Sequence, residues 1–185
     1  DPLSIPIYEP HSVAIDEARN LVYISSFLGV RMVNRTSNLV TTVFAFNNTF
    51  RCVIQIDSVN NVLYIAQFSQ ILILSMNEFH SQLNQPNPSY EPLPAAVQFA
   101  GIHNKRGNFG DGSLSVDAVF NYIRGMVIDT RNSILYAVDI ENFNVRQVTN
   151  ITCYYGAYGD FPCTYCKEGT YSDVFGAKTC KLCPL

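Results

Sequence analysis

Four cysteines near the end of the chain have the spacing of a metal site or of a disulfide module. Cys163 and Cys166 form one Cys-x-x-Cys pair, and Cys180 and Cys183 form a second pair after 13 intervening residues. Thiolates at this spacing can hold a structural Zn²⁺ ion in tetrahedral geometry. The same cysteines can instead form two disulfides, in any of three connectivities. The compartment in which the chain folds therefore decides between the two chemistries.

Three glycosylation signals favour an oxidising, secretory compartment. Sequons of the form Asn-x-Ser/Thr begin at Asn34, Asn47 and Asn150, and each is a predicted N-glycosylation site. The even number of cysteines, 6 with Cys52 and Cys153 included, agrees with this compartment, because disulfides persist where thiols are not kept reduced. We therefore expect disulfides rather than zinc, N-linked glycans, and an extracellular or cell-surface location.

The charge and the apolar segments exclude several partners. Only 15% of the residues are charged and the net charge is −3, so no basic stripe for nucleic acid or anionic lipid is predicted. The longest apolar run is far shorter than the roughly 20 residues that span a bilayer, and no direct membrane insertion is expected. The first residues lack the basic and apolar regions of a signal peptide, so we expect any such peptide to have been removed or to lie outside this chain.

The residues between the cysteine pairs resemble a known type of extracellular module. Gly-Thr-Tyr-Ser follows Cys166, Gly176 lies in mid-loop, and the second pair ends in Cys-x-x-Cys-Pro. This pattern is similar to the short cysteine-rich repeats of the ephrin-receptor-like and EGF-like type. The resemblance implies a nested pairing, Cys166 with Cys180 and Cys163 with Cys183. Cys52 and Cys153 then remain to tie the middle of the main domain to its C-terminal edge. Such repeats usually lead into another copy, so more chain is expected to follow.

An internal repeat organises the main domain. Segments 10–34, 50–75 and 122–149 each contain an alternating apolar run ending in Ile-Asp, a polar turn, and a second run containing Val-Tyr or Leu-Tyr. The matching residues are Asp16, Asp57, Asp129, Tyr23, Tyr64 and Tyr136. Period-two alternation between polar turns predicts antiparallel hairpins. The aspartate ends each first strand because its side chain can bond to the backbone of the turn.

Further strands complete each repeat as a propeller blade. Fourth strands are predicted at 38–46, 95–101 and 152–158, and units of four strands over roughly 40 to 50 residues are typical of propellers. The segment 100–129, with its Ala-Gly, Gly-Asp-Gly and Ala-x-Phe-Asn steps, resembles the blade-linking loops of NHL-repeat proteins. Asp139 and Asn142 also fit the NHL pattern, whereas Ser26 and Gln67 replace that aspartate in the first two repeats.

The predicted fold is therefore all-β, with two domains. Residues 1–158 form a partial β-propeller of about three four-stranded antiparallel blades, and residues 159–185 form the cysteine-rich module, truncated at its end. Closed propellers need about four to eight blades, so something must cover the two end blades. The candidates are further blades of a longer chain, a second copy, or neighbouring subunits along a filament.

Neither a catalytic nor a cofactor site is predicted. NHL-type propellers include a peptide-amidating lyase with three metal-bound histidines, and His11 invites that comparison. The equivalent positions of the other two repeats hold Arg51-Cys52 and Arg124-Gly125, so we expect neither the metal nor an enzyme. Asp111 and Asp117 are weak candidates for calcium ligands, because a turn between blades already explains the glycine-rich segment around them. The proline-containing segment 80–97 is predicted to be a long polar crossing inside the second blade. Because a loop this long is often functional, we expect it to project and contact a neighbour.

Three functional classes follow from these features. The first is a structural subunit of an extracellular filament or surface coat, which associates with copies of itself or related subunits. NHL-like repeats joined to an EGF-like module resemble components of flagellar hairs (mastigonemes). The second is a ligand-binding propeller segment of a receptor ectodomain, and the third is a secreted metal-dependent lyase. The absence of a catalytic arrangement in the sequence favours the first.

Overall fold

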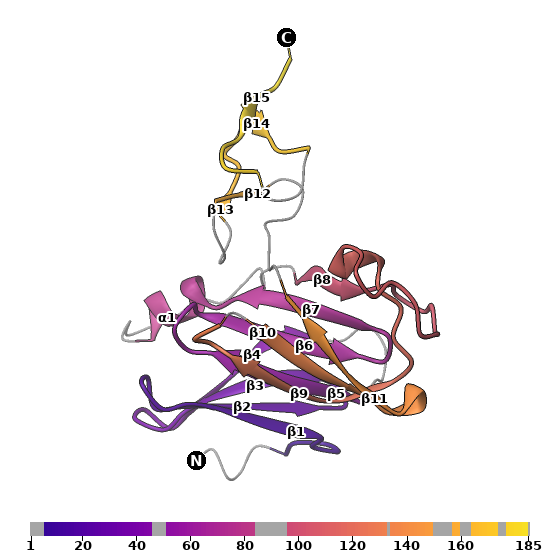
Figure 1. Ribbon diagram of the computed structural model, residues 1–185. Helices are drawn as coiled ribbons and strands as arrows, with labels where there is room; N and C mark the ends of the chain where they lie inside the picture. Colours follow the sequence, from indigo (N-terminus) through magenta and orange to yellow (C-terminus); the bar gives the residue numbers. More distant parts are fainter. Residues whose placement is uncertain are drawn as a thin grey trace. The chain divides into compact units, whose positions relative to one another are not determined.

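The chain folds as two compact units, each rich in antiparallel strands. The computed structural model describes residues 6–45, 51–83, 96–132, 134–149, 157–159, 164–173 and 177–184. The units are Asp1–Val148 and Thr149–Leu185. The fold is all-β, with a partial β-propeller in the first unit and a small disulfide-containing module in the second (Figure 1). The division between the units falls 10 residues before the predicted domain boundary.

The first two sheets are four-stranded antiparallel blades whose strands pair in sequence order. The first sheet contains β1 (Ser12–Asp16), β2 (Leu21–Ser26), β3 (Gly29–Asn34) and β4 (Leu39–Ala45). The second contains β5 (Cys52–Asp57), β6 (Val62–Gln67), β7 (Gln70–Ser75) and β8 (Val97–Gly101). Two of the predicted fourth strands are therefore confirmed as β4 and β8.

The third sheet has three strands among the described residues. The prediction of a fourth strand at 152–158 is wrong for residues 157–158, the part of that segment that the structure describes. The strands are β9 (Ile123–Asp129), β10 (Ile134–Asp139) and β11 (Asn144–Val148). Of the predicted strand 152–158, β12 (Ala157–Tyr158) pairs with β13 (Thr164–Tyr165) in the second unit, and residues 152–156 lie outside the described residues. The hydrogen bonds of this segment are made within the module, where Gly159 N also donates to the Ala177 carbonyl over 2.8 Å.

The three sheets are arranged as successive blades, with their first strands side by side. β1 contacts β5, and β5 contacts β9; Figure 1 shows these strands close together where the sheets meet. A continuous core fills the space between the first two sheets. It includes Leu21, Tyr23 and Met32 from the first, and Ile54 and Leu63 from the second. Apolar residues on one face of each sheet therefore hold neighbouring blades together.

An aspartate ends the first strand of each blade by accepting hydrogen bonds from its own turn. Asp57 Oδ1 accepts from the backbone of Val59 and Asn60, both over 3.0 Å, and Asp57 Oδ2 accepts from Asn60 Nδ2 over 2.8 Å. Asp129 repeats this pattern with the backbone of Arg131 and Asn132 and with the side chain of Asn132. In the first blade Arg19 takes the place of the asparagine and bonds to Asp16 over 3.0 Å. The repeated Ile-Asp step thus has the local role that the sequence predicts.

A short helix follows β7 where the sequence predicts a polar crossing. Helix α1 (Asn77–Gln82) overlaps the start of segment 80–97, and residues 84–95 lie outside the described residues. The helix forms because Met76 and Phe79 are buried in the core between the first two sheets, and that packing outweighs local polarity. No helix in the described parts of the chain is long and apolar enough to cross a membrane.

The second unit consists of short hairpins joined by a disulfide. Besides the β12–β13 pair, β14 (Thr170–Tyr171) pairs with β15 (Lys181–Leu182). Cys166 and Cys180 are bonded, with their Cα atoms 5.8 Å apart. Lys181 Nζ lies 2.7 Å from Asp173 Oδ1 across the exposed surface of the hairpin. A unit this small has little core, so covalent cross-linking is a main source of its stability.

Candidate functional site

The first predicted glycosylation site, Asn34, is the last residue of β3, where the exposed turn to β4 begins. Asn34 Oδ1 accepts hydrogen bonds from the backbone of Thr36 and Ser37, over 2.9 and 3.2 Å. A glycan would be attached through Nδ2, which leaves both of these bonds in place. The Thr36 hydroxyl, the other essential part of the sequon, accepts from Asn20 Nδ2 over 3.1 Å. The other two sequons, at Asn47 and Asn150, lie outside the described residues.

The cysteines are only partly arranged as the family resemblance implies. The predicted bond between Cys166 and Cys180 is present, and it uses two of the four sulfurs that a zinc site would need. Cys183 is an exposed free thiol and Cys52 a buried one, so the structure departs from the predicted bonds of Cys183 and Cys52. Their predicted partners, Cys163 and Cys153, lie outside the described residues.

The burial of Cys52 explains why it behaves as a core residue. Its side chain lies in the core between the first two sheets, and its carbonyl accepts a hydrogen bond from Ser25 Oγ over 2.9 Å. Burial raises the pKa of the Cys52 thiol to about 12, which keeps it protonated and unreactive at neutral pH. Nothing in the sequence around Cys52 distinguishes a buried thiol of this kind from a bonded one.

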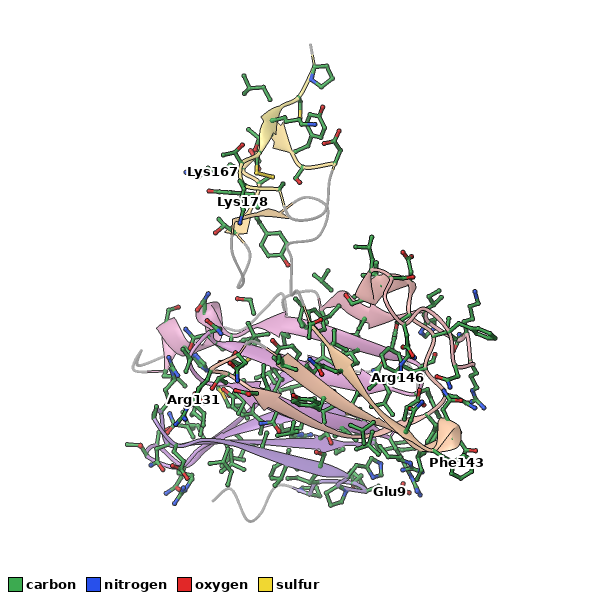
Figure 2. The ribbon with its side chains drawn as sticks, viewed as in Figure 1. Glu9, Arg131, Phe143, Arg146, Lys167 and Lys178 are labelled. Atoms are coloured by element: carbon green, nitrogen blue, oxygen red, sulfur yellow. A yellow bond between two sulfur atoms is a disulfide. The ribbon has the colours of Figure 1, made fainter. Side chains whose placement is uncertain are left out.

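A buried arginine holds the glycine-rich segment against the third sheet, and sequence reasoning missed it. Arg146 on β11 (Figure 2) donates to the carbonyls of Val119 and Phe109, over 2.6 and 3.1 Å. It also forms an ion pair with Asp111 and lies over the Phe120 ring at 4.5 Å. Asp111, a weak calcium candidate in the sequence, is therefore bound to a cation of the protein itself.

Asp139 and Asn142, singled out by their place in the repeat, have structural roles. Asp139 is fully buried and accepts from Asn121 N and Asn142 Nδ2, both over 2.8 Å. Asn142 Nδ2 also donates to the Gly107 carbonyl over 2.7 Å. These bonds fasten the linking segment to the β10–β11 turn.

The three histidines do not form a metal site in the part of the chain that the structure describes. No group of three or more His, Cys, Asp or Glu side chains there could hold a metal ion. His80 on α1 instead lies 2.9 Å from the Tyr23 hydroxyl and 3.2 Å from Asn61 Oδ1. His103 is exposed in the segment after β8.

The outer face of the first sheet is apolar and partly exposed. We call it the leading face; strand pairing places its side chains on one side of β1, β2 and β3. It consists of Val13, Ile15, Val22, Ile24 and Val33, and Arg31, the partner of Ile24, lies on the same side. Val13 is 59% and Ile15 51% exposed, which is unusual for neighbouring aliphatic side chains on a regular sheet.

The outer face of the third sheet has the same character. We call it the trailing face, and it lies on one side of β9, β10 and β11. It consists of Val127, Ile134, Tyr136, Val138 and Val145, and Gln147, the partner of Tyr136, lies on the same side. Val145 is 63% and Val127 55% exposed. Each of the two outer sheets thus has apolar side chains exposed to solvent in this structure.

The repeated tyrosines show how the end sheets differ from the middle one. Tyr23 and Tyr64 are fully buried, whereas Tyr136, at the same position of the third sheet, is only partly buried. Each tyrosine is the third residue of its strand, which is β2, β6 or β10. Each lies on the face of its sheet that is directed toward the position of the next blade. In the first two blades this face is covered by the next blade. In the third blade the corresponding face is exposed to solvent.

Comparisons with known proteins show the fold of this chain alone. No protein-family model matches the sequence, and no curated protein matches it. Solved structures do match: an auxiliary nutrient binding protein from Bacteroides thetaiotaomicron has a TM-score of 0.59 at 15% identity. One from Bacteroides ovatus has a TM-score of 0.61 at 12% identity. Each match covers 94% of this chain and 40% of that protein. The chain therefore shares a β-rich fold with about two fifths of each of these longer proteins.

Proposed function

We propose that the protein is an extracellular structural glycoprotein, a subunit that packs through its two end sheets into a filament or surface assembly. The observation that carries this proposal is the exposure of the leading and trailing faces. Nine of their ten side chains occupy positions that are buried in the second sheet. The proposed role is structural rather than catalytic, and its partners are copies of the chain or related subunits.

The free energy of burying these faces supports association. Full burial of one aliphatic side chain contributes about 1.5–3 kcal/mol, and the most exposed members of both faces have roughly half of that still to gain. Several such side chains on each face form a contiguous apolar patch, which is typical of protein contact surfaces. Two different contact surfaces on one subunit can build an open series of subunits.

The proposed location follows from the disulfide and from the sequons. Cys166–Cys180 favours an oxidising compartment, and Asn34 ends β3 beside the exposed turn, on neither apolar face. A glycan at Asn34 would therefore be compatible with packing of the end sheets. The resemblance to NHL repeats followed by an ephrin-receptor-like or EGF-like module supports an assembly of the flagellar-hair type.

Native material tests this proposal directly. We expect glycosylated protein from its natural source to appear in negative-stain electron micrographs as regular filaments or arrays with a repeat of subunit size. The same material should sediment as species much larger than the 20.7 kDa chain. Uniform particles that sediment as monomers at micromolar concentration would contradict the proposal.

A second candidate function is ligand binding by a larger propeller. The two similar structures are named as auxiliary nutrient binding proteins, and the chain spans 40% of each. In such a protein, further sheets of the same polypeptide would cover both faces. The mass of the native polypeptide after deglycosylation distinguishes the two candidates: a value far above 20.7 kDa, together with monomeric particles, would favour this second function.

A further inference from the structure

We propose that the trailing face of one copy packs against the leading face of a second copy, and so repeats the junction between successive blades inside the chain. This inference rests on the proposed function, because it names the contact through which the subunits join. It commits to one occupant for each open face, a second copy of this chain.

The leading face has the pattern of a face that packs on a preceding blade. Counted from the repeated aspartate, its five residues match five residues of the second sheet. Those five are Ile54, Ile56, Leu63, Ile65 and Leu74. All of them are buried in the core against the first sheet. Ile56, for example, is 5% exposed, whereas its equivalent Ile15 is 51% exposed.

The trailing face has the complementary pattern, that of a face covered by a following blade. Four of its residues match residues on the other face of the second sheet. Those four are Val62, Tyr64, Ala66 and Ile71. All four are buried, and Ile71 has no exposed surface while its equivalent Val145 is 63% exposed.

These patterns favour a contact between unlike faces. At the junction of the first two sheets, a face that carries a repeated tyrosine, Tyr23, meets a face of branched aliphatic residues such as Ile54 and Leu63. The trailing face carries Tyr136, whereas the leading face consists of valine and isoleucine, with Arg31 beside them and no aromatic side chain on that side of β1, β2 and β3. Trailing against leading thus reproduces the internal arrangement, whereas two leading faces in contact would not.

The turn between β10 and β11, at one end of the third sheet, favours the same contact. Inside the chain, Phe68 in the β6–β7 turn packs on Tyr122 of the next blade, with ring centroids 5.0 Å apart. Phe143 in the β10–β11 turn has the same left-handed backbone as Phe68, with φ of 54° and 45°, and is 95% exposed (Figure 2). Glu9 stands seven residues before Asp16, as Tyr122 stands before Asp129, and both have positive φ.

In the proposed contact, Phe143 of one copy therefore lies against the segment around Glu9 of the next. This contact would lack one hydrogen bond that joins the second and third blades inside the chain. Ile123 N donates to the Phe68 carbonyl over 2.7 Å, but the equivalent of Ile123 in the first blade is Pro10, which has no N–H group. Apolar packing must accordingly hold this part of the contact.

Two blocked variants, studied alone and mixed, test the inference. Ile15→Glu places a charge on the leading face and Val145→Glu places one on the trailing face; both side chains are more than half exposed, so folding should be preserved. Val59→Glu is the matched control, because Val59 lies exposed in the β5–β6 turn on neither face. Sedimentation velocity is measured on the full chain, and near-UV circular dichroism checks the fold.

We expect the wild type and Val59→Glu to assemble, and each blocked variant alone to remain monomeric. An equimolar mixture of Ile15→Glu and Val145→Glu should form a one-to-one dimer, because the intact trailing face of the former meets the intact leading face of the latter. If either substitution disturbs the fold, Val13→Glu and Val127→Glu replace the pair, since both sites are similarly exposed.

The outcomes separate this inference from the proposed function. A wild type that assembles, with no dimer in the mixture, overturns the contact between unlike faces and leaves the structural role standing. Dimers of Ile15→Glu alone also overturn it, because they would join two trailing faces. A monomeric wild type overturns the proposed function and this inference with it.

Discussion

The Tyr23 hydroxyl lies 2.9 Å from Nε2 of His80, which joins the second strand of the first sheet to the helix that follows the third strand of the second. The other ring nitrogen, Nδ1, lies 3.2 Å from Asn61 Oδ1. A neutral imidazole satisfies both contacts, since Nδ1–H can donate to Asn61 while Nε2 accepts from the tyrosine. Burial, with a smaller effect of the Arg19 charge, lowers the pKa of His80 to about 4.

Stability should therefore decrease in mild acid through His80. The unfolded chain binds a proton at His80 near pH 6.5 and the folded chain only near pH 4, so the unfolded state binds more protons between these values. The free energy of unfolding is then expected to fall as the pH is lowered from 6.5 to 4. Urea denaturation at several pH values measures this slope.

Two histidine variants isolate that effect. His80→Gln should remove part of the slope between pH 6.5 and 5, where most carboxylates remain charged. His103→Gln should retain the full slope, because His103 is exposed. An unchanged slope in His80→Gln would show that the Tyr23–His80 contact does not control the acid sensitivity.

Gly101 at the end of β8 should not tolerate a side chain, whereas Gly112 should tolerate one better. Both have positive φ, 79° and 81°, so alanine costs each of them about 1–2 kcal/mol of backbone strain. A Cβ at Gly101 would also lie 2.1 Å from the Ser69 carbonyl oxygen, while a Cβ at Gly112 meets nothing within 4 Å. Gly101→Ala should thus lose about 1–3 kcal/mol more, or fail to fold. Equal midpoints of urea denaturation for the two variants would contradict this close contact.

Thr36 should control glycosylation at Asn34 without affecting the fold. Thr36→Ala removes the hydroxyl that the sequon requires and one exposed hydrogen bond with Asn20. We expect loss of one glycan by mass spectrometry and a change in unfolding free energy within about 0.5 kcal/mol. Thr36→Ser keeps the sequon and should keep the glycan. A glycan-free site in the wild type would refute the assignment of Asn34.

Cys52 and Cys183 should differ in their reaction with iodoacetamide. Cys183 is exposed and should be alkylated in the native protein, whereas Cys52 is buried with its pKa raised to about 12 and should react only after unfolding. Peptide mass spectrometry without reductant measures both positions. If Cys52 remained unmodified in denaturant and reacted only after reduction, it would be part of a disulfide, as the sequence analysis expects.

Local repetition made much of the fold predictable. The Ile-Asp step recurs with a fixed distance to a tyrosine, and the aspartate closes its turn through backbone bonds that depend only on neighbouring residues. Alternation then defines which side chains share a face, so the strands of the first two sheets follow from their sequence. The pairing of Cys166 with Cys180 is implied only by the resemblance to ephrin-receptor-like and EGF-like repeats, because four cysteines permit three connectivities.

Other features depend on contacts between distant residues, and the sequence does not reveal them. Arg146 is buried because Asp111, 35 residues away, and the carbonyl of Phe109 surround it. Cys52 is a free core thiol because neighbouring sheets enclose it. The pairing of β12 with β13 places residues 157–158 in the second unit, although their apolar and aromatic pattern also suits a fourth strand of the third blade.

The difference between the tyrosine-bearing trailing face and the aliphatic leading face gives any series of joined copies a polarity. One terminus of such a series would display Tyr136 and its neighbours, and the opposite terminus would display Val13 and Ile15. Addition of subunits would then proceed at different rates at the two termini. A capping protein or an anchor that recognises one terminus would not fit the other, so the direction of growth would be encoded in a single subunit.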